Sequence, residues 1–133
     1  MLTHVSRMRI LVSGDIAMAV LLVQDIAHEV GFSSLKVALL ATAASELVTN
    51  VIKYAESGLI TIRVVKDNLK NGLEVTVEDV GPGIENINQA MKDHISSGGT
   101  LGLGLPGTKR MVDEFNIVSI LGKGTTVRIV KWI

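Results

Sequence analysis

Side chains that could take part in chemistry stand first in a long apolar segment without glycine or proline. Glu46 and Asn50 are four residues apart there, and this spacing places both on one face of a helix. A carboxylate at the edge of an apolar core needs a partner, because burying it unpaired is costly. Taken alone, the pair fits the solvated side of a helix as well as a functional site.

A second carboxylate, Asp79, ends a predicted strand and is followed by Gly81-Pro82-Gly83. The pattern D-x-G-x-G lets the backbone turn sharply and pass close to a ligand. A carboxylate at such a strand end can accept hydrogen bonds from an exocyclic amine. An ordinary Gly-Pro turn is the competing interpretation.

A glycine-rich segment, Ser96 to Gly107, leads directly into a predicted helix. Backbone N–H groups in such a loop, with a helix N-terminus behind them, can cradle phosphate; a plain surface loop is the alternative. Gly102, Gly104 and Gly107 also spell G-x-G-x-x-G, but too few residues follow for a doubly wound dinucleotide-binding domain.

A fourth segment, Gly122-Lys123-Gly124-Thr125, opens the last predicted strand and by itself resembles a hairpin turn. Hydrophobic periodicity predicts the elements that must position all four segments. The predicted strands cover residues 8–12, 59–65, 73–79, 116–121 and 125–133, and the predicted helices cover 16–30, 35–55 and 105–115, with a short one near 88–94. Residues 80–104 are predicted as a long loop or lid. This order gives an α+β sandwich with a mostly antiparallel sheet and helices on one face.

The predicted helix over residues 16–30 is unusually apolar, since its first eight residues, Ile16 to Val23, include no polar side chain. Such a helix is either buried on most sides or exposes one side that a partner covers. The run is too short to span a membrane, which takes about 18–20 residues.

Composition limits the remaining possibilities. The 133 residues suit one domain, 1–133, and 47% of them are apolar. Thirteen basic residues balance thirteen acidic ones, so we expect neither nucleic acid nor an anionic membrane as a partner. The chain has no cysteine, which excludes disulfides, thiolate metal sites and cysteine nucleophiles. We therefore expect a soluble, cytoplasmic protein.

The four segments together, in this order and on these elements, resemble the four sequence boxes of the GHKL superfamily of ATP-binding proteins. The resemblance covers residues 35–133 and implies a Bergerat fold, a mixed and mostly antiparallel sheet with an ATP lid. Within the superfamily the chain is similar to the small anti-sigma-factor-type serine/threonine kinases, and most similar to the switch kinases of the stressosome. Gly104-Leu105-Pro106-Gly107, Met111 to Phe115 and Lys131-Trp132-Ile133 carry that closer match.

The resemblance implies ATP and Mg²⁺ as cofactors and a role for each matching residue. Glu46 would act as the general base, Asn50 would hold Mg²⁺, and Lys53 would approach the phosphates. Asp79 would bind the adenine amine, and the pocket wall and ring edge would be formed by Gly81, Gly83 and Thr125. The phosphates would meet the backbone N–H groups of Gly102, Leu103 and Gly104.

The family also implies partners, and the sequence leaves three functions open. The first is a kinase that phosphorylates small STAS-domain proteins and then binds a phosphatase as its second partner. The second is an anti-sigma factor that sequesters a sigma factor in an ATP-dependent way. The third is the detached ATPase domain of a histidine kinase, which is disfavoured because no dimerisation hairpin surrounds the three histidines, His4, His28 and His94.

Overall fold

The computed structural model of the protein describes residues 5–84, 91 and 104–133. In chain order the elements are β1 (Val5–Ile10), α1 (Gly14–Val30), α2 (Ser34–Tyr54), β2 (Gly58–Asp67), β3 (Lys70–Asp79), α4 (Gly104–Met111), β4 (Glu114–Ile120) and β5 (Gly124–Trp132). The short helix predicted near 88–94, apart from Met91, and most of the predicted lid lie outside the described residues.

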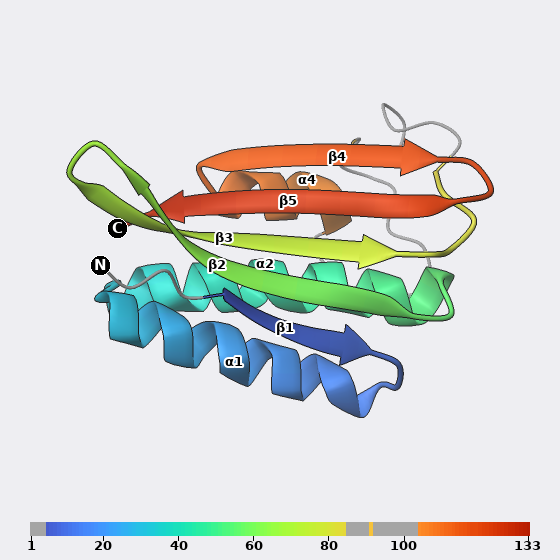
Figure 1. Cartoon of the computed structure of the whole chain (residues 1–133), viewed down its shortest axis with the longest axis horizontal. Helices are drawn as coiled ribbons and strands as arrows, with labels where there is room; N and C mark the ends of the chain where they lie inside the picture. The colour runs from blue at the N-terminus through green and yellow to red at the C-terminus, as the bar shows by residue number, and fades with distance from the viewer. Residues whose placement is uncertain (1–4, 85–90, 92–103) are drawn as a thin grey trace.

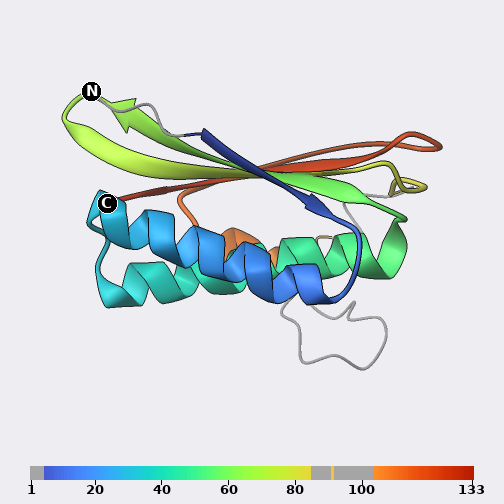
Figure 2. The same ribbon diagram turned by 60° about the horizontal axis from the view of Figure 1, so that its bottom comes forward.

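The five strands form one sheet in the order β1-β2-β3-β5-β4. All four pairings between these strands are antiparallel. The three helices of the described residues lie on one face of the sheet, with α1 and α2 side by side and α4 behind β4 and β5 (Figures 1 and 2). The predicted α+β sandwich with helices on one face is confirmed.

The register of the sheet decides which side chains face the helices. Val77 pairs with Ile60 on one side and with Val127 on the other, and all three are buried. Because cross-strand partners share a face, the alternate residues Glu74, Thr76 and Glu78 project from the opposite, open face, as the alternation predicts.

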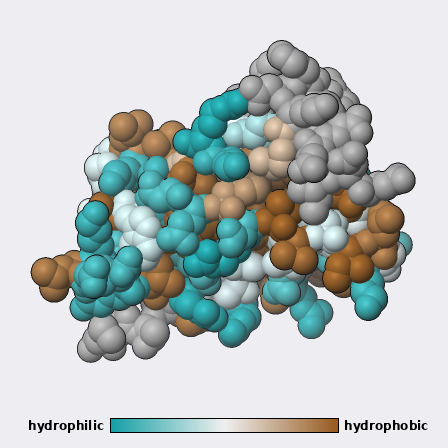
Figure 3. All heavy atoms as spheres, turned by 90° about the horizontal axis from the view of Figure 1, so that it is seen from above, coloured by the Kyte–Doolittle hydropathy of each residue, from teal (hydrophilic) through white to brown (hydrophobic). Residues whose placement is uncertain are grey.

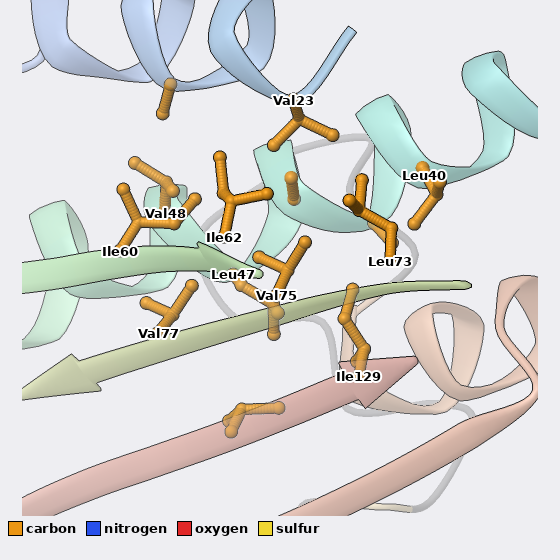
Figure 4. Packing of buried hydrophobic residues seen from close by; sticks show 14 of the residues in the cluster. Val23, Leu40, Leu47, Val48, Ile60, Ile62, Leu73, Val75, Val77 and Ile129 are labelled. Atoms are coloured by element: carbon orange, nitrogen blue, oxygen red, sulfur yellow. The ribbon is translucent and has the colours of Figure 1, made fainter. Parts of the chain in front are cut away.

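Helix α2 is the central helix of the core. Figure 4 shows its Leu47 and Val48 close to buried side chains of the sheet. Burying one such aliphatic side chain contributes roughly 1.5–3 kcal/mol. By length and composition alone α2 could cross a membrane, but its apolar stripe is covered by the sheet and by α1, as in the core helix of a folded domain. The buried positions of α2 are Val37, Leu40, Ala41, Ala43, Ala44, Leu47, Val48 and Val51.

Residue types that favour helix ends stand at the boundary between α1 and α2. Gly31 has a left-handed φ of 104° at the C-terminus of α1, and the Ser33 side chain accepts a hydrogen bond from the N–H of Lys36 at the start of α2. Asp15 does not cap its own helix; its Oδ2 accepts hydrogen bonds from the N–H groups of Leu11 and Val12 at 2.8 and 3.0 Å. Those two residues therefore leave β1, which ends at Ile10 instead of the predicted Val12.

The predicted helix 105–115 is wrong at its C-terminal end. Helix α4 stops at Met111, and Glu114 and Phe115 already belong to β4, paired with Val130 and Ile129. Strand pairing supplies the backbone hydrogen bonds that the helix would otherwise have provided. The β2–β3 turn is also tighter than predicted, with only Asn68 (φ 54°) and Leu69 outside the paired positions.

Candidate functional site

Asp79, the last residue of β3, is hydrogen-bonded to the start of β5. Its Oδ1 accepts hydrogen bonds from the backbone N–H of Gly81 at 2.9 Å and of Thr125 at 3.1 Å. Within the part of the chain that the structure describes, Oδ2 has no hydrogen-bond partner. The carboxylate is thus fixed through one oxygen, and the other can accept a hydrogen bond from an amine.

Gly81 and Gly83 let the segment after Asp79 lie against two other elements. A methyl group at Gly81 would lie 2.8 Å from the Cβ of Ala55, directly after α2. Gly83 has a φ of 81°, and a methyl group there would lie 2.6 Å from the carbonyl oxygen of Ile120 in β4. These close approaches explain why glycine is needed at both positions of D-x-G-x-G.

Ser119, which sequence reasoning missed, connects β4 to Thr125 and to Ile84 through hydrogen bonds. It is the cross-strand partner of Thr125, and their hydroxyl oxygens are 2.8 Å apart. The N–H of Ile84 donates to Ser119 Oγ at 2.6 Å. The only signal in the sequence is that Ser119 follows the apolar residues Phe115 and Ile117 at alternate positions of β4. That Thr125 is its partner follows only from the register of β4 against β5.

Contacts at the end of α2 bring Asn50 toward Asp79. Gly58, the partner of Asp79 in β2, packs against Val51, and Gly81 packs against Ala55. With a rise of about 1.5 Å per residue, Asn50 lies about 7.5 Å along the helix axis from Ala55. Helix α2 lies on one side of the sheet (Figure 2).

Glu46 lies one helical turn before Asn50 on the same face of α2, and both side chains are half-buried. Lys53, three residues after Asn50, is exposed. The three side chains therefore follow one another along α2, with Asn50 between Glu46 and the end of the helix that contacts Gly81.

Gly104 is the first residue of α4 and has a left-handed φ of 66°. Its carbonyl oxygen accepts a hydrogen bond from the Thr108 hydroxyl at 3.0 Å, and Thr108 is fully buried. The two other predicted phosphate-contacting residues, Gly102 and Leu103, lie outside the described residues. Helix α4 packs against α2, so its N-terminus and α2 belong to the same layer.

Lys131, which the sequence marked only as part of the family match, holds the opposite end of α4. Its side chain is buried, and its Nζ donates to the carbonyl oxygen of Met111 at 2.8 Å. A lysine cation at a helix C-terminus satisfies a free carbonyl and interacts favourably with the helix dipole. The position of α4 is thus coupled to β5, the strand that also carries Thr125.

The N-terminal half of α1 exposes apolar side chains. Met18 and Leu21 lie on one exposed face, and Leu11 and Val12 are exposed in the preceding turn. We call these four residues the α1 patch. Of the two interpretations of this apolar helix, the one with an exposed side agrees with the structure. A second exposed apolar set, Val118, Ile120 and Leu121, lies on β4 and the turn after it; Figure 3 looks onto this edge and shows polar and apolar residues mixed.

The open face of the sheet carries an ion-pair ladder instead of a site. Arg128 Nε lies 2.7 Å from Glu74 Oε2, and its Nη1 lies 3.4 Å from Glu114 Oε1, while Arg63 reaches Glu74 at 3.8 Å. The hydrogen bond to Glu74 raises the pKa of Arg128 above its ordinary value. Within the described residues no group of three or more His, Cys, Asp or Glu side chains could hold a metal ion.

Comparison with solved structures identifies the fold. The RsbU and RsbW domains of Rv1364c from Mycobacterium tuberculosis match with a TM-score of 0.64 at 16% identity, over 95% of this chain and 32% of that one. The catalytic domain of the histidine kinase ThkA matches with a TM-score of 0.54 at 16% identity, over 95% of both chains. At such low identity the likeness concerns the fold alone.

Sequence comparison is more specific. Serine/threonine-protein kinase RsbT of Bacillus subtilis (strain 168) is 44% identical over 128 residues, which cover 96% of each chain. An anti-sigma F factor of Caldanaerobacter subterraneus subsp. tengcongensis is 36% identical over 104 residues, covering 74% of this chain and 71% of that protein. The model of the histidine kinase-, DNA gyrase B-, and HSP90-like ATPases matches residues 36–132. The chain therefore belongs to this ATPase family, and within it to the serine/threonine-protein kinases related to RsbT.

Proposed function

We propose that this protein uses Mg-ATP to phosphorylate a serine or threonine of a small STAS-domain protein, and that it switches partners in a bacterial stress-signalling pathway. Its relationship to RsbT, which extends over 96% of both chains, supports the reaction class. One structural observation carries the nucleotide site: Asp79 is fixed through Oδ1 to two backbone N–H groups, and its Oδ2 remains available.

The adenine end of the proposed site lies at the junction of β3 and β5. Asp79 Oδ2 would accept a hydrogen bond from the adenine amine, and Gly81 and Gly83 would shape the wall beside the ring. The hydroxyl of Thr125 would reach the ring edge, directly or through a water molecule. The backbone bond between Thr125 and Asp79 supports this assignment, since it keeps the two residues adjacent.

The phosphate end of the proposed site lies between α2 and the start of α4. Backbone N–H groups of Gly102, Leu103 and Gly104 would bind phosphate oxygens at the positive end of α4, and Lys53 would approach them from α2.

The amide oxygen of Asn50 would hold Mg²⁺. The fit is chemically reasonable, because Mg²⁺ at phosphate sites takes hard oxygen ligands and often only one or two from the protein. Such a site does not need the acidic cluster that is missing from the described residues. When bound, the metal would offset the negative charge of the phosphates.

Glu46 would serve as the general base. As the acceptor hydroxyl oxygen attacks the γ-phosphorus, its proton would pass to the Glu46 carboxylate and the bond to the leaving ADP oxygen would break. Phosphoryl transfer depends mainly on positioning and on stabilising spread charge. The half-buried position of Glu46, one turn from Asn50, supports this role.

The partners belong to the same proposal. STAS-domain proteins would be the substrates, and a phosphatase would be bound and activated after phosphorylation has released the substrate. The α1 patch is the candidate docking surface for that second partner, because it is apolar and exposed. The cytoplasm is the proposed location.

The test compares Glu46→Gln with a matched control, Glu56→Gln, which removes an exposed carboxylate just after α2. Each variant is incubated with ATP, Mg²⁺ and a STAS-domain protein, and the new phosphate is mapped by mass spectrometry. Glu46→Gln should bind ATP normally and lose roughly two to four orders of magnitude in rate, the usual contribution of a general base. Unchanged phosphate incorporation would remove Glu46 from this role.

A second candidate function is an ATP-dependent anti-sigma factor, which the 36% identity to anti-sigma F factor favours. The longer and closer match to RsbT favours the kinase that switches partners. A pull-down with the purified chain separates the two, because retention of a sigma factor would support the second function.

A further inference from the structure

The Ser119 hydroxyl has three polar neighbours, and their distances limit how its proton can point. Ile84 N–H donates to Ser119 Oγ at 2.6 Å, which uses one lone pair. The single proton of Ser119 can then go to Thr125 Oγ1 at 2.8 Å or to the carbonyl oxygen of Gly124 at 3.4 Å. The bond to Gly124 is close to the longest distance at which a hydrogen bond contributes, so giving it up costs little.

The direction of the Ser119 proton decides what Thr125 can offer to a ligand. If Ser119 donates to Thr125, one lone pair of Thr125 is used and its own proton is free to point away from Ser119. If Thr125 donates to Ser119 instead, only lone pairs of Thr125 remain. A hydroxyl carries a single proton, so these two states are exclusive.

A 6-aminopurine presents a donor, the amine, beside an acceptor, ring nitrogen N1. Asp79 Oδ2 can only accept, and it suits the amine. The neighbouring N1 then accepts a hydrogen bond donated directly by the Thr125 hydroxyl. This complement exists only in the state in which Ser119 donates to Thr125.

We infer that Ser119 is a positioning residue for adenine recognition: it accepts from Ile84, donates to Thr125 and so aims the Thr125 proton at purine N1. This rests on the proposed function, since it presupposes adenine beside Asp79. The link to Ile84 has a second consequence, because the strand residue that orients Thr125 also holds Ile84, next to Gly83.

The test uses ATP and 1-deaza-ATP, in which N1 is replaced by C–H and the amine is kept. The wild type should bind ATP more tightly than 1-deaza-ATP by roughly 2- to 12-fold, the range that corresponds to one net hydrogen bond. In Ser119→Ala this ratio should fall toward one, whereas Ser119→Thr, which keeps the hydroxyl, should restore it. Dissociation constants are measured by calorimetry, and thermal melting of each variant monitors folding.

A double-mutant cycle separates positioning from a structural effect. In a Thr125→Val background, Ser119→Ala should leave the ratio of the ATP and 1-deaza-ATP affinities unchanged, because the hydroxyl that Ser119 orients is already missing. The inference is overturned if Ser119→Ala keeps the full wild-type ratio, if it weakens both nucleotides equally, or if the wild type does not discriminate between them. A wild type that binds neither nucleotide would instead contradict the proposed function itself.

Discussion

Replacing Asp79 with asparagine should weaken ATP binding without unfolding the protein. The substitution keeps the shape of the side chain, and the amide oxygen can take the place of Oδ1, which accepts from the N–H groups of Gly81 and Thr125. The NH₂ group then stands where Oδ2 stood. Two donors, this NH₂ and the adenine amine, would face each other.

The magnitude follows from the bond that is lost. A hydrogen bond to a charged acceptor contributes about 1.5–3 kcal/mol, which corresponds to a roughly 10- to 150-fold higher Kd for ATP. The opposite orientation of the asparagine would direct its NH₂ group at two backbone donors and break both bonds at once. The fold therefore selects the orientation that is unfavourable to adenine.

Isothermal titration calorimetry measures the change, and a chemical control makes it specific. Purine riboside triphosphate lacks the 6-amine, so its affinity should be nearly equal for wild type and Asp79→Asn. Inosine triphosphate carries an acceptor at position 6, so its affinity relative to ATP should rise in the variant. Glu78→Gln, which alters the neighbouring exposed carboxylate, is the matched protein control and should bind ATP normally. Normal ATP affinity of Asp79→Asn would refute the adenine assignment.

Three further predictions concern the framework of the site. Leu40→Ala should lower the free energy of unfolding by about 2–5 kcal/mol because Leu40 is fully buried. Its control, Leu35→Ala, alters a residue that is 70% exposed on the same helix and should change this free energy by less than about 0.5 kcal/mol. Equal losses for the two variants in urea unfolding would contradict the packing. Lys131→Met should speed amide hydrogen exchange in residues 104–111 by freeing the carbonyl of Met111; unchanged exchange would show that this bond does not hold α4. Hydrogen bonds from the N–H groups of Val12 and Leu11 lower the pKa of Asp15. The contribution of Asp15 to stability is therefore present above the unfolded pKa of about 3.9 and is lost as pH falls through the lower folded pKa. The difference in unfolding free energy between wild type and Asp15→Ala should shrink in acid, and a constant difference from pH 6 to 3 would argue against this reasoning.

Local sequence patterns were sufficient for most of the fold. The helical period of α2, the alternation in β2 and β3, and the caps at Gly31 and Ser33 are decided by neighbours within a few residues, so they can be read from the chain. The boundary between α4 and β4 could not be predicted in this way. Glu114 and Phe115 are compatible with a helix, and only pairing with the distant β5 makes them a strand.

The same division holds for the candidate site. The sequence by itself determined which residue types are available: a carboxylate at a strand end, glycines where the backbone must turn, and an acid and an amide one turn apart on a helix. Only the tertiary structure decided that Asp79 is held through Oδ1 alone, that Ser119 lies against Thr125, and that Lys131 reaches the end of α4. These contacts join residues from different strands and helices. Their geometry depends on strand register and helix packing, which are set by the burial of the whole core and not by any local pattern.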